Sequence, residues 1–465
     1  MDFATYITNH TTTLNGAVSN RSSLNACLDL FSMGVSASNK EQLIRAALAE
    51  DPLLATKVVF YLRDCRQGQG NKDILQAFFD ILFARPVDTP LLKVLEFIPM
   101  IGYWKDLVKL TMNHPQALPL LLPIFHNGLR AENPGLCAKW LPRKGPMANE
   151  LRKYLGLTPK EYRHLLVNLS STVEQQICAN KWSEVNYKSV PSRANKLYAN
   201  AFLAHDPVRR QAFLAKVMTG ETKMNSGQLY PHEIVTSLRY NAAAADAMWK
   251  SLPNYMSNAV NVLPVIDTSS SMGSVAGGTT VSCLSIAVAL GIYFSEHNTG
   301  SYKDVWCNFS DRPSFYKLQG TTLSQRVRNL DYDNWGSSTN LQAVFDLILQ
   351  VYVNNKESIE NLPKMVLIVS DMEFNNCGRT RNLDVIKAKY HALGLTPPTI
   401  VFWRVDVKSM QQPATFLDDG TVLINGFSPA ILKELLAGNI ENFTPLSLML
   451  KAIGDKYDYL DNLFK

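Results

Sequence analysis

The feature that most constrains the fold is an apolar run that leads directly into an Asp-x-Ser-x-Ser sequence. Val265 and Ile266 end the run, and Asp267, Ser269 and Ser271 follow. A carboxylate and two hydroxyls are hard oxygen ligands, which suit Mg²⁺ better than zinc or copper. Asp and Ser also begin helices, because their side chains accept backbone N–H bonds. This segment alone therefore predicts either a metal-binding loop or an ordinary strand-to-helix turn.

Two later segments favour the metal-binding loop. Gly336 precedes Thr339 and an amphipathic run, and Asp371 closes a second apolar run at 367–370. Both segments follow the pattern of loops at one end of a sheet. Together they complete a candidate metal-binding set: Asp267, Ser269, Ser271, Thr339 and Asp371.

The pattern around this set predicts a doubly wound α/β domain. Short apolar runs alternate with stretches of helical period, which is the arrangement that builds a largely parallel sheet. Leu341 to Tyr352 shows one apolar helix face. Ligands of such sheets bind at the carboxyl ends of the strands. Pro264 lies inside the first run and lacks a backbone N–H, so we expect a bulge there. The runs are 262–266, 304–309, 365–370, 399–405 and 421–424.

The five oxygen-bearing residues resemble the metal-ion-dependent adhesion site of a von Willebrand factor A domain. In that family, the equivalent side chains coordinate one divalent ion, directly or through water. The resemblance therefore implies Mg²⁺, or another divalent cation, held by Asp267, Ser269, Ser271, Thr339 and Asp371. It also implies an open coordination position for a water or for a partner's carboxylate.

The first half of the chain shows helical periodicity. Apolar stripes run through 54–62 and 74–83, with breaks at Gly68-Gln69-Gly70 and Arg85-Pro86. Thr158-Pro159-Lys160-Glu161 is a capping box with proline at the first helical position. Stacked helical hairpins of this kind suggest a HEAT-like α-helical repeat, although no clean sequence period is present. We predict a helical-repeat domain at 1–258 and the A domain at 259–465.

This layout resembles the Ro autoantigen family, in which a TROVE region of helical repeats forms a ring closed by an A domain. The Ro resemblance implies binding of structured non-coding RNA outside the ring and of single-stranded ends in its central hole. Five further motifs are Phe60-Tyr61-Leu62-Arg63-Asp64, Gly68-Gln69-Gly70-Asn71-Lys72, Gly102-Tyr103-Trp104-Lys105-Asp106-Leu107, Ala138-Lys139-Trp140-Leu141-Pro142 and Val190-Pro191-Ser192-Arg193-Ala194. On these motifs the chain resembles more closely an uncharacterised family of plant, fungal and viral proteins with the same layout.

Charge is divided unevenly between the two predicted domains. Residues 1–258 carry 29 Lys and Arg against 20 Asp and Glu, whereas the remainder carries 17 against 20. A basic first domain suggests an anionic partner, with nucleic acid the leading candidate. The pI of about 8.8 is too mild to establish this by itself.

Two segments, 130–163 and 181–216, combine cations with aromatic residues. Cations neutralise phosphates, and flat rings stack on bases. The alternative is a solvated basic face whose aromatic residues belong to the core. The candidate RNA-binding residues are Lys139, Arg143, Lys144, Lys181, Arg193, Lys196, Arg209 and Arg210.

The glycine-rich segment from Arg63 to Lys72 admits two interpretations. Its backbone amides could surround a phosphate, as glycine-rich nests do. Its spacing is not that of a Walker loop, and it follows a helix, so nucleotide hydrolysis is not expected. The competing interpretation is a tight inter-helix turn with an Arg63–Asp64 pairing network.

We expect an RNA-binding ribonucleoprotein component that is not an enzyme. The eight histidines form no metalloprotease pair, and there is no G-x-S-x-G elbow. The alternative is a protein-interaction adaptor whose metal site binds an acidic side chain or which serves an AAA ATPase. Seven scattered cysteines and no signal-peptide pattern favour a cytoplasmic protein without membrane contact. We expect a monomer, because a ring built within one chain needs no partner subunit.

Overall fold

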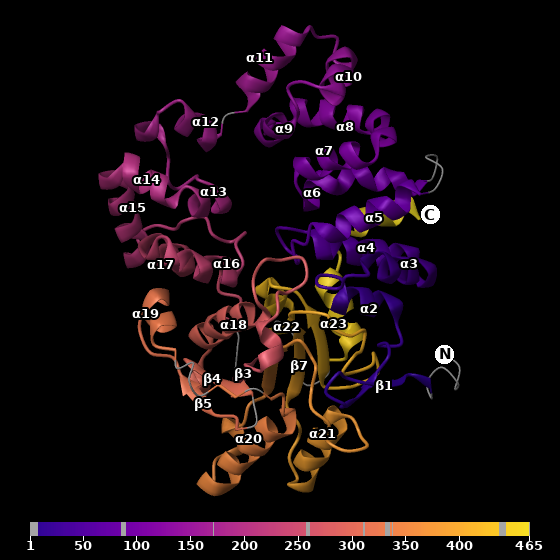
Figure 1. Ribbon diagram of the computed structural model, residues 1–465, viewed down its shortest axis with the longest axis vertical. Helices are drawn as coiled ribbons and strands as arrows, with labels where there is room; N and C mark the ends of the chain where they lie inside the picture. Colours follow the sequence, from indigo (N-terminus) through magenta and orange to yellow (C-terminus); the bar gives the residue numbers. More distant parts are fainter. Residues whose placement is uncertain are drawn as a thin grey trace.

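A helical region and a six-stranded sheet make up the chain, seen here in a computed structural model (Figure 1). The structure describes residues 8–84, 90–170, 172–256, 261–309, 312–330, 335–336, 338–436 and 443–464. The helices follow the chain up one side of the molecule, across its top and down the other side (Figure 1). They form an arch over the sheet. Neither a repeat of identical units nor a closed ring is established by this arch, and both stay predictions.

The helical region consists of short helices joined by tight turns. Their bounds are α2 Ala26–Met33, α3 Lys40–Glu50, α4 Pro52–Arg63, α5 Asp73–Phe83, α6 Ile98–Ile101, α7 Trp104–Asn113, α8 Leu118–Arg130, α9 Gly135–Trp140, α10 Pro146–Tyr154, α11 Pro159–Leu169, α12 Val173–Cys178, α13 Ser192–Leu197, α14 Ala199–His205, α15 Pro207–Thr219, α16 Pro231–Val235 and α17 Ala242–Lys250. The 3₁₀ segments η1 Pro90–Phe97, η2 Pro115–Ala117, η3 Trp182–Glu184 and η4 Thr236–Arg239 connect them.

Local sequence explains where several of these helices begin. Asp51 caps α4 by accepting a hydrogen bond from the Leu54 amide at 2.9 Å, with proline next in the chain. The predicted capping box at Thr158 is confirmed: Thr158 Oγ1 accepts from the Glu161 amide, and Glu161 accepts from the Thr158 amide.

The α/β region contains every strand that the apolar runs predict. The elements are β3 Val262–Asp267, η5 Ser270–Gly273, α18 Cys283–His297, η6 Gly300–Tyr302, β4 Val305–Phe309, β5 Phe315–Lys317, α19 Leu323–Arg328, α20 Leu341–Asn355, η7 Ile359–Asn361, β6 Met365–Ser370, α21 Asn382–Ala392, β7 Thr399–Arg404, β8 Thr421–Asn425, η8 Pro429–Ile431, α22 Leu432–Leu436, α23 Pro445–Ile453 and η10 Asp458–Leu463. The sheet order is β5-β4-β3-β6-β7-β8, and only β5 pairs antiparallel. This short edge strand is an element that the sequence did not predict.

Pro264 is accommodated without the predicted bulge. The pairing of β3 with β6 runs in continuous register through Pro264, which lies opposite Leu367. On the other side, pairing with β4 begins only at Val265. The expected bulge is therefore wrong, because the proline precedes the β4 ladder and leaves the β6 ladder intact.

The two faces of the sheet pack into different cores. Leu263 and Val265 face a core completed by α20 and α21. Val262 and Ile266 face a core that contains α18 and continues into the helical region. Helix α18 approaches the sheet closely at Gly291, where an added Cβ would lie 2.5 Å from Trp306. One continuous core therefore joins the arch to the sheet.

Both ends of the chain cross between the two regions. A hairpin of β1 (His10–Thr12) and β2 (Val18–Asn20) packs beside the sheet, where Asn20 bridges to Gln412. At the other end, Tyr457 donates a hydrogen bond to Asp64 Oδ2 at 3.0 Å in the helical region. The predicted boundary between residues 258 and 259 lies outside the described residues and stays a prediction, and both ends of the chain contact the opposite region.

The seven cysteines are free thiols. Within the described ranges, no helix has both the length and the apolar character needed to cross a membrane.

Acid should destabilise the junction between α16 and the sheet. His232 is buried, packing 5.5 Å from Tyr230 and 5.4 Å from Phe427, and burial lowers its pKa to about 4. The unfolded chain takes up this proton near pH 6.5, so the stabilisation is complete above that pH. Between pH 6.5 and 4 the free energy of unfolding should fall by up to roughly 3 kcal/mol.

His232→Phe should flatten that decline, because it keeps the ring and removes the titration. Urea unfolding of both proteins at pH 7 and pH 5 measures the effect. An equal loss of stability in both proteins would contradict the assignment to His232.

Candidate metal centre and nucleic-acid interface

Asp267 and Asp371 lie at the carboxyl ends of two adjacent parallel strands. Asp267 ends β3, Asp371 follows β6, and both side chains are fully buried. Asp267 Oδ2 accepts a hydrogen bond from Ser370 Oγ at 2.5 Å, and Oδ1 accepts one from the Ser269 amide at 2.9 Å. Burial first, and then the Asp371 carboxylate, raise the pKa of Asp267 to about 7. Two neighbouring carboxylates buried away from water favour a cation between them.

The hydroxyls of the predicted set occupy two loops. Ser269 Oγ and Ser271 Oγ lie 3.0 Å apart in the turn after β3. Thr339 is buried beside the loop that follows β6, where its hydroxyl contacts the Glu373 carbonyl at 2.8 Å and Asn375 Oδ1 at 2.7 Å. The Asp267 and Asp371 loops thus meet, and Thr339 joins them through the Glu373 segment.

The amino-terminal hairpin supports this edge of the sheet from outside the α/β region. Asn15 Nδ2 donates to Thr339 Oγ1 at 3.0 Å and to the Glu373 carbonyl at 2.7 Å. The Leu14 amide donates to Glu373 Oε2 at 2.7 Å. The position of Thr339 therefore depends on Asn15, which lies 324 residues earlier in the sequence.

A lysine that sequence reasoning missed reaches into the centre. Lys408 Nζ lies 2.7 Å from Asp371 Oδ2 and donates to the Ser271 carbonyl at 2.5 Å. Arg404 is buried nearby, and burial lowers its pKa to about 10 while the Glu373 and Asp371 carboxylates oppose the shift. No sequence signal marked Lys408, because it lies in the loop after β7, far from the three motifs.

The donor set fits a hard divalent cation. The side chains offer two carboxylates and two neighbouring hydroxyls, and among the described residues Asp371 Oδ2 receives no bond of hydrogen-bond geometry. The part of the chain that the structure covers holds no cluster of three His, Cys, Asp or Glu ligands. Asp267, Ser269, Ser271 and Asp371 would hold such an ion, with Thr339 at its edge, and the ion would supply positive charge to the buried carboxylates.

Asp267→Asn should weaken Mn²⁺ binding at least about tenfold while preserving the fold, because the amide keeps an oxygen for the Ser269 amide but loses the charge. Calorimetric titration of both proteins measures the affinity, and circular dichroism checks the fold. Equal affinities would argue against Asp267 as a ligand.

Most of the predicted RNA-binding cations have protein partners. Arg143 and Lys144 are exposed in the turn between α9 and α10. Lys139 pairs with Glu174 at 2.7 Å. The remaining paired cations are Lys181 with Glu184, Arg193 and Lys196 with Glu233, and Arg209 with Asp206. Arg209 also donates to three backbone carbonyls in the segment 182–185, and these bonds hold that segment against α15.

Arg210 does not lie at the surface, and its predicted contact with RNA is wrong in this structure. Its side chain is fully buried, with the guanidinium 5.0 Å from the Tyr187 ring and 5.1 Å from the Phe202 ring. Burial lowers its pKa to about 10. Arg210 instead packs the interior of the helical region, where cation–π contacts partly replace its lost hydration.

The glycine-rich segment is a tight turn and not a phosphate nest. The amides of Gly68, Gln69 and Gly70 donate to carbonyls of residues 61 and 64, so they are not available to an anion. The predicted pairing of Arg63 with Asp64 is wrong. Arg63 instead contacts Asp106 Oδ2 at 2.5 Å, and that carboxylate also accepts from the Tyr103 amide.

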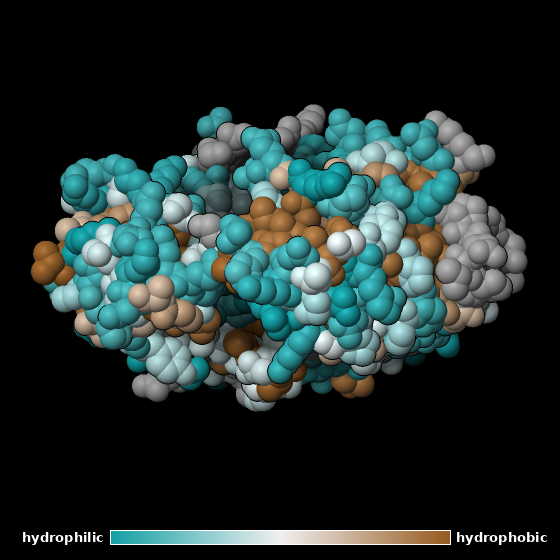
Figure 2. Space-filling view, turned by 90° about the horizontal axis from the view of Figure 1, so that it is seen from above, coloured by the Kyte–Doolittle hydropathy of each residue, from teal (hydrophilic) through white to brown (hydrophobic). Residues whose placement is uncertain are grey.

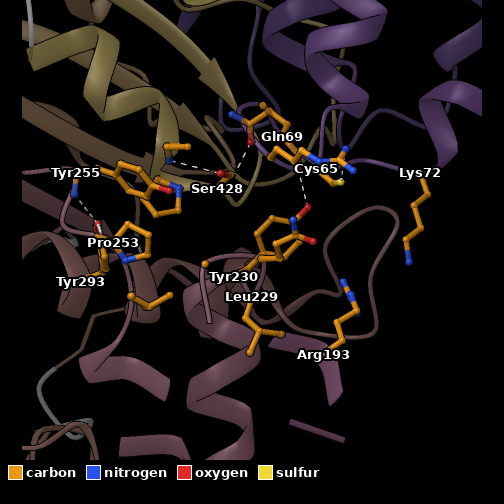
Figure 3. A pocket seen from close by; sticks show the side chains of 18 of the residues that line it. Cys65, Gln69, Lys72, Arg193, Leu229, Tyr230, Pro253, Tyr255, Tyr293 and Ser428 are labelled. Carbon is orange, nitrogen blue, oxygen red and sulfur yellow. Dashed lines mark hydrogen bonds between the residues drawn. The ribbon is translucent and has the colours of Figure 1, made fainter. Parts of the chain in front are cut away.

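A pocket lies beside this turn, at the joint of the arch and the sheet. It encloses about 590 Å³, including space open to solvent, and none of its lining residues is acidic. Arg66, Lys72 and Arg193 contribute three cations. Four tyrosines also line it: Tyr103, Tyr230, Tyr255 and Tyr293. In Figure 3, Lys72 and Arg193 extend toward each other from opposite sides.

The two arms of the arch meet around this pocket. Tyr230 donates to the Gln69 carbonyl at 2.6 Å, and Tyr103 donates to Gln228 Oε1 at 3.2 Å. Gln69 also accepts, through Oε1, a hydrogen bond from the Ser428 amide at 3.4 Å in the α/β region. The pocket walls therefore come from three distant parts of the sequence.

Positive charge in the pocket is only partly compensated. Burial, and then the neighbouring Arg193 and Arg63, lower the pKa of Lys72. Arg63 is occupied by Asp106, and Arg193 lies 3.5 Å from Glu233 outside the pocket lining. A bound anion would relieve this repulsion. The sequence did mark Lys72, but as part of a nest; its meeting with Arg193 depends on tertiary structure.

Comparisons with known proteins return families without an assigned function. Residues 261–451 match a domain of unknown function, DUF7788, and residues 13–116 and 146–262 match another, DUF2828. Uncharacterized protein L728 of Acanthamoeba polyphaga mimivirus is 28% identical over 504 aligned positions, spanning 95% of this chain and 86% of that protein. The predicted similarity to uncharacterised viral proteins is confirmed to this extent.

Among solved structures, the Ro (RSR) protein of Deinococcus radiodurans aligns over 93% of this chain and 100% of that one. The TM-score is 0.34 and the sequence identity is 11%. A similarity this weak carries no argument, and the Ro relation stays a prediction.

Proposed function

We propose that the protein binds RNA through its helical arch and that its α/β region carries a divalent cation as a structural or recruiting centre. The observation that carries the RNA proposal is the acid-free pocket of Arg66, Lys72 and Arg193 with its tyrosine rings. Three cations on a lining without acidic residues favour a phosphate over a neutral ligand. Tyrosine rings favour a phosphate that carries a base, since stacking contributes about 1–3 kcal/mol per base.

The pocket accommodates a single strand better than a duplex. Its three cations lie at the junction of the arch and the sheet, where a chain end or a splayed nucleotide can reach them. Sequence-tolerant recognition of single strands uses this combination of a positive groove with aromatic platforms.

The outer surface offers a second contact region for the same RNA. Trp140 is 36% exposed, and the ammonium groups of Lys105 and Lys139 lie 4.8 Å and 5.6 Å from its ring. Arg143 and Lys144 follow in the next turn. Seen from the helical end, most of the surface is hydrophilic, with a hydrophobic patch and a hollow near the centre (Figure 2). Exposed cations beside an indole suit a phosphate backbone.

RNA affinity should fall steeply with salt. Neutralising three phosphates of a single strand predicts a slope of about −2 in a plot of log K against log salt. Fluorescence anisotropy with a 20-nucleotide oligouridylate, from 50 to 300 mM NaCl, measures it. A flat response, or no binding near micromolar concentration at low salt, would sink the proposal.

Lys72→Gln should weaken this binding about fivefold and reduce the slope by about 0.7, because one phosphate contact is lost. Lys364→Gln is the matched control, since Lys364 is exposed just before strand β6 and does not line the pocket. Equal effects of the two substitutions would show that the pocket is not the binding site.

The alternative adaptor function predicts a different result in a pull-down. Loss of a protein partner on chelation, with no RNA in the purified material, would favour the adaptor. RNA that stays bound after chelation would favour the proposal above.

A further inference from the structure

We propose that Lys408 is a built-in cation of the Asp267–Asp371 centre and that a divalent ion must displace its ammonium group to bind. This inference rests on the metal centre in the proposed function and adds a residue that sets its affinity. The inference follows from the positions of four groups: the carboxylates of Asp267 and Asp371, the Ser271 carbonyl and the Lys408 ammonium.

The two carboxylates are satisfied in different ways. Asp267 accepts hydrogen bonds from the Ser370 hydroxyl and the Ser269 amide. Asp371 Oδ1 accepts a 3.2 Å bond from the Glu373 amide, which leaves Oδ2 to the ammonium of Lys408 at 2.7 Å. The lysine thus supplies its charge at the oxygen that a metal would use.

The loop that carries Lys408 is held firmly on both sides. Ser409 Oγ donates to Glu373 Oε1 at 2.5 Å. Arg404 donates to the Gln411 carbonyl at 2.5 Å, and Gln411 donates to the Met372 carbonyl at 2.9 Å. These bonds tie the loop to the segment that follows Asp371. The lysine therefore points into the centre because the loop is anchored around it.

Charge and space make the lysine and a divalent ion mutually exclusive. One ammonium carries half the charge of a divalent ion, so the ion compensates the two carboxylates more completely. An ion that binds Asp371 Oδ2 would compete with the Lys408 ammonium for the same oxygen. The Lys408 side chain is 18% exposed, so a path to solvent is open to an ammonium that the ion displaces.

Lys408→Met tests the inference by removing the competing charge while keeping most of the side-chain volume. Mn²⁺ is the probe, and its affinity for the full chain is measured by calorimetry and by the electron paramagnetic resonance of free Mn²⁺. We expect the variant to bind Mn²⁺ at least about tenfold more tightly than the wild type. Its melting temperature should fall in metal-free buffer and recover when Mn²⁺ is added.

Lys387→Met is the matched control, because Lys387 lies in the same region and donates to the Asp419 carbonyl at 2.8 Å, away from the centre. It should bind Mn²⁺ as the wild type does. Lys408→Gln is a second variant in case the methionine chain folds poorly, and it should show the same gain in affinity.

Each result decides the question. Equal Mn²⁺ affinity in the wild type and both Lys408 variants would overturn the role of the lysine but keep the metal centre. No Mn²⁺ binding and no Mn²⁺-dependent recovery in any of these proteins would overturn both. Neither result bears on RNA binding, which the salt series tests separately.

Discussion

Two buried carboxylates at the ends of adjacent parallel strands are the constraint on which the rest of this structure depends. Asp267 and Asp371 cannot both carry charge out of water without nearby donors and cations. Ser370, Lys408 and Arg404 meet that need from strands β6 and β7 and the loop after them. The carboxyl edge of the sheet is therefore an assembly of several loops, and it lies where α/β folds of this class place their ligands.

The same edge explains why the helical region and the sheet form one body. The amino-terminal hairpin reaches Thr339 and Glu373 through Asn15, and the carboxyl-terminal segment returns to Asp64 through Tyr457. A continuous core runs from the arch into one face of the sheet. The walls of the pocket at the joint come from both regions.

The sequence predicted the parts of the fold that local patterns determine. Parallel strands buried on both faces are nearly continuous apolar runs, so β3, β6, β7 and β8 stood out, whereas the three-residue edge strand β5 did not. Lys408 and the Lys72–Arg193 pair could not be predicted, because loops from distant segments bring them to their sites. Arg210 was misassigned because a basic residue near aromatic residues in the sequence can be exposed or can be buried among their rings, and the sequence does not distinguish the two.

Diffraction from crystals soaked in Mn²⁺, recorded at an energy where manganese scatters anomalously, tests the central claim most directly. We expect an anomalous peak at coordination distance from Asp371 Oδ2, with the Lys408 ammonium moved away from the Ser271 carbonyl. Saturated crystals that show no peak there, and Lys408 still lying between Ser271 and Asp371, would contradict it.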